Sequence, residues 1–280
     1  MNFTQAIEGI EKAAAERIKV EEGDYYGDDG LLHCGKCHTK KQTRVIILDK
    51  ERTPMCLCKC EVEKREREEN ERRRVEFERR VKDLRRMGFP EADMQGWTFA
   101  NDDGANEKIS TVARNYAANF GRMREDGKGL LLFGKTGTGK SFAAACIANA
   151  LIDKGHPVLM TNFARIRNTL QGLFDGRQEY LDSLNRFPLL ILDDLAAESK
   201  SEYMQEIVYE VINSRYLAGL PLIVTTNLTG DELKHPADIT NQRTFSRLFE
   251  MCIPIEVKGD DRRRDRLKEA HGKYKDILGY

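Results

Sequence analysis

The chain has 280 residues, of which 40% are hydrophobic and 33% are charged, enough for one full-sized globular domain with a smaller module beside it. Its 46 basic and 46 acidic residues give a formal net charge of zero, which excludes a global basic field that would attract nucleic acid. No apolar run is long enough for a transmembrane helix, and the N-terminus lacks the apolar core of a signal peptide. We therefore expect a soluble, cytoplasmic protein with no membrane partner.

The first part of the chain places a cysteine-rich segment between two helical patterns. Within residues 1–20, apolar residues three or four apart predict a helix. The cysteine-rich segment follows and contains a short predicted strand at residues 45–48. Residues 61–86 are almost entirely Glu and Arg, which favours an exposed helix with i,i+4 ion pairs. The Gly-Phe-Pro sequence at 88–90 ends this helix.

Beyond residue 89, strands and helices alternate, which is typical of a parallel sheet covered by helices on both faces. Apolar runs predict strands at residues 130–133, 157–161, 189–192 and 221–225, the last being the final parallel strand. Amphipathic patterns predict helices at about residues 107–120, 140–153, 163–174 and 201–218. The fold class is therefore α/β.

The strongest motif is a complete Walker A sequence between a predicted strand and a predicted helix. Its glycines let backbone N–H groups turn toward phosphate oxygens, and the helix presents the positive end of its dipole. Lys140 should reach the β- and γ-phosphates of ATP, and the Ser141 hydroxyl should bind Mg²⁺. The predicted nucleotide-binding residues are Gly134, Lys135, Thr136, Gly137, Thr138, Gly139, Lys140, Ser141 and Phe142.

Two further motifs end strands of the same predicted sheet. The apolar run at 189–192 ends in Asp193 and Asp194, a Walker B pattern that delivers carboxylates to the edge where α/β sheets bind ligands. Asp193 should hold Mg²⁺ through water, and Asp194 should polarise the attacking water. Asn227 follows the strand at 221–225, and its amide can orient that water and sense the γ-phosphate.

Five of the seven cysteines lie within residues 34–60, which in a cytosolic protein favours a metal site over disulfides. The first half is the zinc-knuckle turn Cys34-Gly35-Lys36-Cys37. The second half offers three thiols for two places, Cys56, Cys58 and Cys60, and the neighbouring His33 and His38 are alternative ligands. Because so small a module has little core, zinc would supply much of its folding energy.

The motifs in their order resemble the DnaC/IstB branch of AAA+ ATPases over about residues 90–270. The resemblance rests on Walker A, Asp193-Asp194-Leu195, Thr225-Thr226-Asn227-Leu228 and the Arg-rich tail. Members of this branch carry Asp-Asp where most AAA+ proteins have Asp-Glu. The resemblance implies a P-loop AAA+ core with a parallel five-stranded sheet and little or no helical lid.

The same resemblance assigns roles to arginines near the C-terminus. Arg247 resembles the arginine finger that reaches the γ-phosphate of a neighbouring subunit, with Arg243 beside it on the same helix face. The alternative is a surface Arg247 paired with Glu250. Arg263 occupies the place of the sensor-2 arginine, which acts in cis, and Arg262 is the alternative in that register. Self-assembly is therefore implied.

Single-stranded DNA is the effector that the resemblance implies. The segment 162–167 follows the second strand, where initiator-type AAA+ proteins carry DNA-contacting helices. Phe163 would stack on a base, and Arg165 and Arg167 would meet phosphates. The alternative is an amphipathic helix with Phe163, Ile166 and Leu170 in the core and the two arginines in solvent.

Loaders of the DnaI type carry an N-terminal region, sometimes zinc-binding, that grips the helicase. The resemblance therefore favours Cys34, Cys37, Cys58 and Cys60 as zinc ligands, because such loaders often show Cys-x-Cys before a charged helix. It also implies three parts: a zinc-binding adaptor at 1–60, a charged helical linker at 61–88 and an AAA+ ATPase domain at 89–280. A zinc finger that reads DNA bases through Lys36, Lys40, Lys41 and Arg44 is the competing interpretation.

The resulting hypothesis is an ATP-dependent loader that binds the hexameric replicative helicase and delivers it to single-stranded DNA. ATP, Mg²⁺ and Zn²⁺ are the implied cofactors, and hydrolysis should be slow unless subunits assemble. One alternative is an IstB-like transposition helper that acts on duplex DNA. Another is a nucleotide-gated adaptor with negligible hydrolysis, because Asp194 is one methylene shorter than glutamate.

Overall fold

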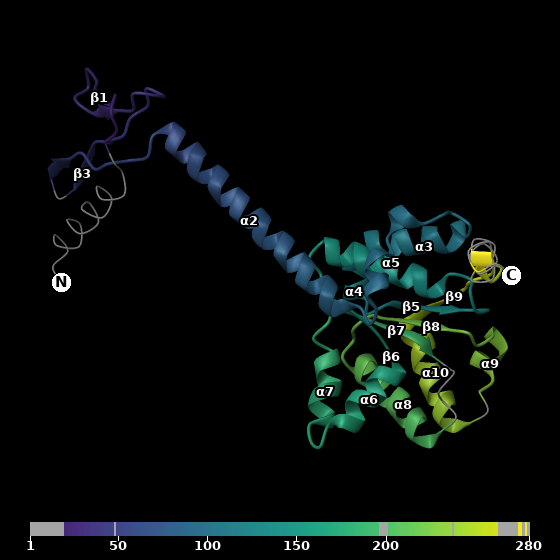
Figure 1. The fold of residues 1–280 in the computed structure, drawn as a ribbon. Helices are drawn as coiled ribbons and strands as arrows, with labels where there is room; N and C mark the ends of the chain where they lie inside the picture. Colours follow the sequence, from purple (N-terminus) through teal and green to yellow (C-terminus); the bar gives the residue numbers. More distant parts are fainter. Residues whose placement is uncertain are drawn as a thin grey trace. The chain divides into compact units, whose positions relative to one another are not determined.

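The computed structural model describes residues 20–47, 49–195, 201–236 and 238–262, together with residues 274, 275 and 278. The helix predicted within residues 1–20 therefore lies outside the described part, apart from its last residue. The chain divides into two compact units, Met1–Glu78 and Arg79–Tyr280, and the division falls inside one long helix (Figure 1). Each unit is described by itself below.

The described part of the first unit contains two short antiparallel hairpins. Strand β1 (Tyr25–Tyr26) pairs with β2 (Leu32–His33), and β3 (Val45–Ile47) pairs with β4 (Lys50–Arg52). The strand predicted at 45–48 is confirmed over its first three residues, and Leu48 lies outside the described residues. Among the residues of this unit that the structure describes, the buried apolar ones are Leu31, Leu32, Cys34 and Cys58. These four side chains by themselves bury too little surface to hold a fold without a metal or another crosslink.

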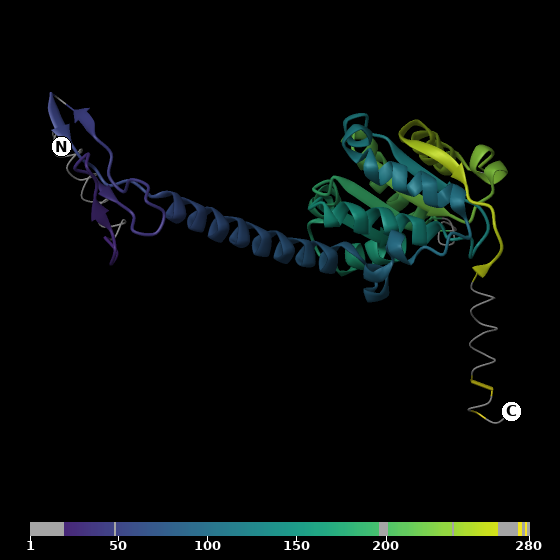
Figure 2. The ribbon, with the colours of Figure 1, turned by 90° about the horizontal axis from the view of Figure 1, so that it is seen from above.

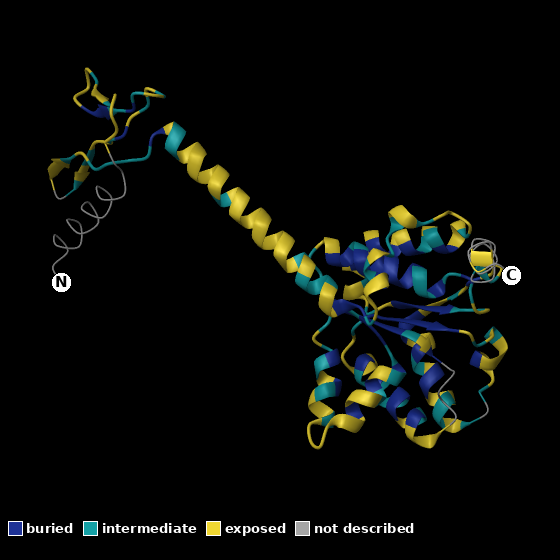
Figure 3. Ribbon diagram, in the orientation of Figure 1, coloured by how far each residue is buried: buried dark blue, intermediate teal, exposed yellow. Residues whose placement is uncertain are grey.

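Helix α2 (Lys59–Gly88) confirms the predicted charged helix and extends it by two residues at each end. Its exposed length carries the expected ion pairs between neighbouring turns, including Arg73 with Glu69 at 2.9 Å (Figure 3). Near its end, Val81 and Leu84 pack on the core of the second unit. A Cβ on Gly88 would lie 2.6 Å from the Val158 carbonyl oxygen, so the helix ends where only glycine fits against the sheet.

The second unit is built on a parallel sheet of five strands in the order β6-β7-β8-β5-β9. The strands are β5 (Gly129–Phe133), β6 (Val158–Asn162), β7 (Leu189–Leu195), β8 (Leu222–Thr226) and β9 (Cys252–Glu256). The four strands predicted from apolar runs are confirmed.

Strand β9 corrects the expectation that the strand at 221–225 is the final parallel one. It is an edge strand, three of its five residues are exposed, and it contains Pro254. Proline cannot donate to a sheet ladder and is confined to edges, so the residues of β9 do not resemble a buried parallel strand.

Helices cover both faces of the sheet (Figures 1 and 2). One face carries α3 (Glu107–Ala118), α4 (Phe120–Glu125) and α5 (Lys140–Asp153), and the other carries α6 (Phe163–Gly172), α7 (Arg177–Leu184), α8 (Glu202–Leu217) and α10 (Ile239–Met251). Along β5, Leu130 and Leu132 point into the first core and Leu131 into the second, as the two-residue period of a strand requires.

Short elements complete the unit: η1 (Ala92–Gly96), η2 (Phe99–Asn101) and α9 (Gly230–Lys234). Helices α4, α7 and α9 were not predicted from the sequence. In the part of the chain that the structure describes, no helix combines the length and apolar character that crossing a bilayer would need.

Candidate nucleotide and zinc sites

The Walker A loop joins the end of β5 to the first turn of α5. Gly134, Gly137 and Gly139 have φ angles of 132°, 80° and 98°, a region that side chains rarely adopt. A Cβ on Gly134 would also lie 2.6 Å from the Val257 carbonyl oxygen. The ammonium group of Lys140 donates to the carbonyl oxygens of Gly134 and Lys135, at 2.8 and 2.7 Å. The loop therefore has the backbone that wraps a phosphate, with its lysine held inside it.

A cleft of about 440 Å³ brings most of the predicted site residues together. They come from the phosphate loop, from the end of β7 and from the residue after β8, and are Thr136, Gly137, Gly139, Lys140, Ser141, Phe142, Asp193, Asp194 and Asn227. Of the predicted loop residues outside this lining, Lys135 has an exposed side chain, and Thr138 is buried with its hydroxyl donating to the Lys135 carbonyl oxygen at 3.0 Å. The sequence motifs thus converge on one surface that is large enough for a nucleotide.

The two Walker B aspartates are fixed by a threonine on the neighbouring strand. The Thr225 hydroxyl donates to the Asp193 carboxylate at 2.6 Å and accepts the Asp194 backbone N–H at 2.9 Å. Asp194 has a φ of +59°, and the register of β7 against β8 shifts between Leu192 and Leu195. This irregularity lets consecutive aspartates both reach the cleft. Sequence reasoning did not select Thr225, although strand pairing with Walker B indicates its position.

One wall of the cleft was not predicted from the sequence, and its residues precede β5, the first strand of the parallel sheet along the chain. Gly96, Trp97, Asn101 and Asp103 line it, and the Asn101 side chain donates to the Gly96 carbonyl oxygen at 2.7 Å. No known phosphate-binding or catalytic motif marks these residues. The available signal is Trp97, the one tryptophan of the chain, just ahead of the ATPase fold.

Of the two candidate sensor-2 arginines, Arg262 lines the cleft and Arg263 lies outside the described residues. The Arg262 guanidinium forms an ion pair with Asp103, and its backbone N–H donates to the Gly137 carbonyl oxygen at 3.2 Å. Through these two contacts, Arg262 connects the segment after β9 both to the phosphate loop and to Asp103.

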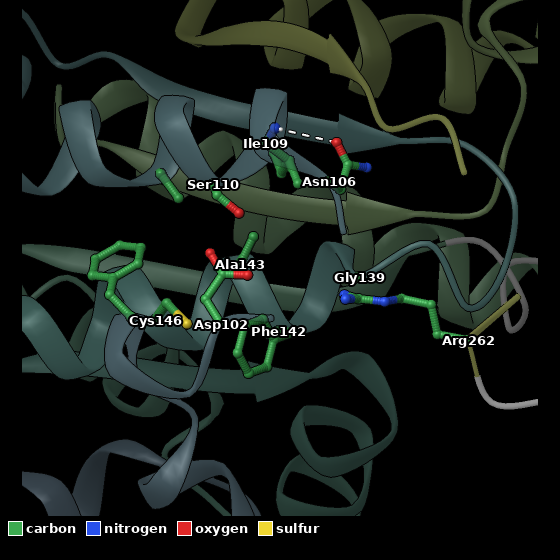
Figure 4. Close-up of a pocket in the computed structure, with 11 residues that line it drawn as sticks. Asp102, Asn106, Ile109, Ser110, Gly139, Phe142, Ala143, Cys146 and Arg262 are labelled. Carbon is green, nitrogen blue, oxygen red and sulfur yellow. Dashed lines mark hydrogen bonds between the residues drawn. The ribbon is translucent and has the colours of Figure 1, made fainter. Parts of the chain in front are cut away.

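A much smaller cavity lies beside the cleft, between α3 and α5 (Figure 4). Its volume is about 10 Å³, room for one water molecule at most. Phe142, Gly139 and Arg262 border both spaces. This cavity is a packing feature and not a ligand site.

The predicted arginine-finger residues lie on α10, and neither is among the described residues that line the cleft. Arg243 is exposed. The Arg247 guanidinium lies over the ring of Tyr209 at 4.6 Å and that of Tyr216 at 5.8 Å, both on α8. The suggested partner Glu250 instead accepts the Tyr216 hydroxyl, at 2.7 Å.

Helix α6 settles the alternatives for Phe163. The ring is 3% exposed and packs in the core with Ile166 and Leu170, so the apolar face of the amphipathic-helix interpretation is confirmed and stacking of this ring on a base is wrong. Of the two arginines expected in solvent, Arg165 is exposed and Arg167 is half-buried. The Arg165 guanidinium donates to the Pro90 carbonyl oxygen at 2.6 Å, and that of Arg167 to the Asn168 side chain at 3.4 Å.

The four favoured cysteines of the first unit form one cluster. The sulfur atoms of Cys34, Cys37, Cys58 and Cys60 all lie within 4.8 Å of one another. The Cys60 sulfur is 3.6 Å from that of Cys34 and 3.3 Å from that of Cys58. Four thiolates around a tetrahedral zinc at about 2.3 Å stand about 3.8 Å apart, so the donor set fits this ion.

The alternative ligands lie outside this cluster. The Cys56 thiol contacts the Lys40 carbonyl oxygen at 3.6 Å. His33 is 3.2 Å from the Asp29 carboxylate, and His38 is 3.2 Å from the Tyr25 hydroxyl. These side chains already have partners elsewhere in the unit.

Polar groups around the cluster shape its first turn. The Asp24 carboxylate accepts the Gly35 N–H at 3.1 Å and the Lys41 ammonium at 2.6 Å, and the bond from Lys41 lowers the pKa of Asp24 to about 2. A side chain at Gly35 would collide with the Gly23 carbonyl oxygen. The Thr39 hydroxyl, 3.1 Å from the Cys37 sulfur, lowers the pKa of Cys37, whereas the neighbouring Cys58 thiol raises the pKa of Cys60.

The basic residues invoked for base reading are paired within the unit. Lys36 meets Glu21 at 2.8 Å, Lys40 meets Asp29 at 2.8 Å, and Arg44 meets Glu51 at 2.7 Å. Lys41 is buried against Asp24. A DNA phosphate would have to compete with these carboxylates, so the pairing disfavours the DNA-reading zinc finger.

Comparison with known proteins places this site in a family. The model described as IstB-like ATP binding protein matches residues 58–270. The replicative helicase loader DnaI of Bacillus subtilis (strain 168) is 28% identical over 207 residues, 68% of this chain and 66% of DnaI. The insertion sequence ATP-binding protein y4iQ/y4nD/y4sD of Sinorhizobium fredii (strain NBRC 101917 / NGR234) is 41% identical over 151 residues, 51% of this chain and 49% of that protein.

Solved structures agree. The crystal structure of DnaI matches with a TM-score of 0.53 and 26% identity, and the match covers 64% of this chain and 99% of the DnaI chain in that structure. That of the DnaC helicase loader has a TM-score of 0.52 and 24% identity, covers 60% and 100%, and supports the fold alone. The chain spans 49–66% of the length of the two curated relatives named above. With the family match over most of its length and the Walker residues in one cleft, the chain belongs to the IstB-like ATP-binding proteins, the DnaC/IstB branch of the AAA+ ATPases.

Proposed function

We propose that the chain hydrolyses ATP in this cleft and uses it to load the hexameric replicative helicase onto single-stranded DNA. The observation that carries the proposal is the cleft itself, where the phosphate loop, both Walker B aspartates and Asn227 meet. The loader assignment is supported by the similarity to DnaI, which extends over 207 residues. In this proposal residues 1–60 are the helicase adaptor, 61–88 the linker and 89–280 the ATPase domain.

The site residues fit the roles of a phosphoryl-transfer enzyme. Lys140 would neutralise the β- and γ-phosphates. The Ser141 hydroxyl and the Asp193 carboxylate face the same cleft, and they would hold Mg²⁺, which supplies charge neutralisation to the phosphates. Because Thr225 bonds one Asp193 oxygen, the carboxylate is oriented before nucleotide arrives. Asp194 would polarise the attacking water and Asn227 would orient it.

Hydrolysis would be slow in the isolated subunit, because the arginine that completes the site would come from α10 of a neighbour. We retain Arg247 for this role, with Arg243 beside it, and the sensor-2 arginine at Arg263 or Arg262. In its own subunit Arg247 is held by tyrosines, so it would have to leave this stack to reach a neighbouring phosphate.

Mixing two inactive variants tests whether the arginine acts between subunits. One variant is Arg247→Ala with intact Walker residues, and the other is the double variant Asp193→Asn, Asp194→Asn with intact arginines. We expect each alone to lose at least about 10-fold in ATP turnover and an equimolar mixture to regain about a quarter of the unaltered rate, since half of the subunits keep the Walker residues and half of their neighbours keep Arg247. A mixture no faster than its components would contradict the proposal. The same experiment with Arg243→Ala decides which of the two arginines acts.

Native mass spectrometry tests the loader assignment, with the replicative helicase of the same organism and with or without ATP. We expect the full chain to form a complex and a Cys34→Ser, Cys37→Ser variant to lose it, because the adaptor would lack its metal. A Lys135→Ala variant, altered only on the exposed surface of the phosphate loop, should bind normally. Absence of any complex with the unaltered chain would reject the loader.

A transposition helper is the second candidate, and the 41% identity to the insertion sequence ATP-binding protein favours it. Its partner would be a transposase on duplex DNA. The cysteine cluster and the charged helix α2 support the loader over this candidate, since an adaptor and a linker suit a chain that must hold a large ring. A complex with a transposase but not with a helicase would reverse the choice.

A further inference from the structure

A buried amide joins the end of helix α2 to the wall of the nucleotide cleft. Asn149 lies on α5, the helix that follows the phosphate loop, and is 1% exposed. We propose that Asn149 and Arg85 are positioning residues that couple the last turns of α2 to Trp97, so that nucleotide binding and the seating of α2 stabilise each other. The inference rests on the proposed binding of ATP in this cleft.

The Asn149 side chain donates hydrogen bonds to the turn at 94–97 and accepts one from α2. Its NH₂ group donates to the carbonyl oxygens of Met94 and Trp97, both at 2.9 Å, and more weakly to that of Ala145 at 3.2 Å. Its oxygen accepts Arg85 Nε at 3.2 Å. Rotating the amide by 180° would set oxygen against three carbonyls and NH₂ against a cation, so the contacts fix a single orientation.

Arg85 is the residue of α2 that makes this connection. Its guanidinium also forms an ion pair with Asp153, the last residue of α5, and only 29% of its side chain is exposed. Its neighbour Arg86 is 78% exposed and pairs with Asp83 of the same helix. Of these two adjacent arginines on one helix turn, only Arg85 contacts α5, so Arg86 serves as the control for an experiment.

Trp97 links the hydrogen bonds of Asn149 to the nucleotide cleft. Its carbonyl is held by Asn149, and its side chain lines the cleft with the ring 6.0 Å from that of Phe142, next to Ser141 of the phosphate loop. A nucleotide bound to the phosphate loop presents its base or sugar to this wall. When the turn at 94–97 shifts, the wall shifts with it, and the affinity for nucleotide changes.

The coupling is reciprocal. If nucleotide binds better when the turn at 94–97 is ordered, and if Arg85 and Asn149 order that turn, bound nucleotide must in equal measure strengthen the seating of α2. The linker would then respond to the nucleotide at its ATPase end without any direct contact between α2 and the ligand.

The experiment compares the full chain with Arg85→Met, Asn149→Asp and Arg86→Met. Asn149→Asp is nearly isosteric and keeps an acceptor for Arg85, but it places a carboxylate oxygen against the carbonyls of Met94 and Trp97. Binding of Mg·ADP is followed through the emission of Trp97, the one tryptophan of the chain, and checked by equilibrium dialysis. Amide hydrogen exchange is measured over residues 82–88 with and without Mg·ADP.

We expect Mg·ADP to slow exchange at 82–88 in the unaltered chain and in Arg86→Met, but not in Arg85→Met. The Kd for Mg·ADP should rise about 3- to 10-fold in Arg85→Met and at least as much in Asn149→Asp, the scale of one or two lost hydrogen bonds. A purely structural role would lower the thermal midpoint but leave the ligand-dependent change in exchange intact.

Two results would overturn the inference. If the unaltered chain binds Mg·ADP but Arg85→Met shows the same Kd within 2-fold and the same protection at 82–88, the coupling is absent while nucleotide binding stands. If the unaltered chain does not bind Mg·ADP by dialysis, the proposed nucleotide function fails as well. Arg85→Met changes a partly exposed side chain, so the test does not depend on whether Asn149→Asp folds.

Discussion

Replacing Lys140 with alanine is expected to lower ATP turnover by about 100-fold or more. The lysine lies inside the phosphate loop, 8% exposed, and removing it leaves the β- and γ-phosphates without their one buried cation from the loop. Phosphate release would be measured at equal protein concentration with the helicase present. Because the variant also loses the two hydrogen bonds from Lys140 to carbonyl oxygens of the loop, its thermal midpoint would be measured as well.

Lys135 supplies the control for this experiment. It belongs to the same loop and carries the same charge, but it is exposed and does not line the described cleft. Lys135→Ala should keep turnover within about 3-fold of the unaltered chain. Comparable losses in both variants would mean that general charge, and not the geometry of the loop, attracts the nucleotide. Retention of a tenth of the turnover by Lys140→Ala would argue against hydrolysis in this cleft.

The second large effect is expected for zinc binding. The unaltered chain should carry one zinc per chain, and Cys58→Ser should lose it to a mild chelator, because three thiolates and a hydroxyl hold zinc far more weakly than four thiolates. The described residues of the first unit bury so few apolar side chains that loss of the metal should unfold it, which limited proteolysis would detect. The second unit, with a core of its own, should resist.

Cys56→Ser is the matched control, two residues away. Its thiol contacts a backbone carbonyl and not the cluster, so zinc content and protease resistance should stay unchanged. Metal analysis after dialysis would measure the zinc content of both variants. Loss of zinc from Cys56→Ser together with retention by Cys58→Ser would show that the cluster has a different ligand set.

The parts of the fold that were predicted are those in which local sequence and tertiary environment agree. Strands β7 and β8 are buried on both faces, so their residues form continuous apolar runs, and the motifs at their ends follow directly. The phosphate loop is marked by glycines whose backbone angles other residues avoid. Cysteine spacing indicated the cysteine cluster for the same reason, because the geometry of a tight turn around a metal requires its ligands at fixed short spacings in the sequence.

The parts that were missed depend on contacts between residues far apart in sequence. Strand β9 pairs with β5 across more than a hundred residues, and its exposed face removes the apolar pattern. Trp97 lines the cleft, and its backbone carbonyl accepts a hydrogen bond from Asn149 on a distant helix. The stack of Arg247 on Tyr209 needs α8 and α10 to be neighbours, which no spacing along the chain reveals.

The proline in β9 bears on solubility. The outer row of backbone groups of an edge strand can accept a strand from another molecule, which is a common start of aggregation. Pro254 removes one donor from β9, and the exposed charge of Glu256 lies two residues further on. Sheets of neighbouring copies therefore cannot readily join into one continuous sheet at this edge. If subunits assemble on a helicase ring as proposed, they would meet at this edge through side-chain surfaces, and such contacts are reversible.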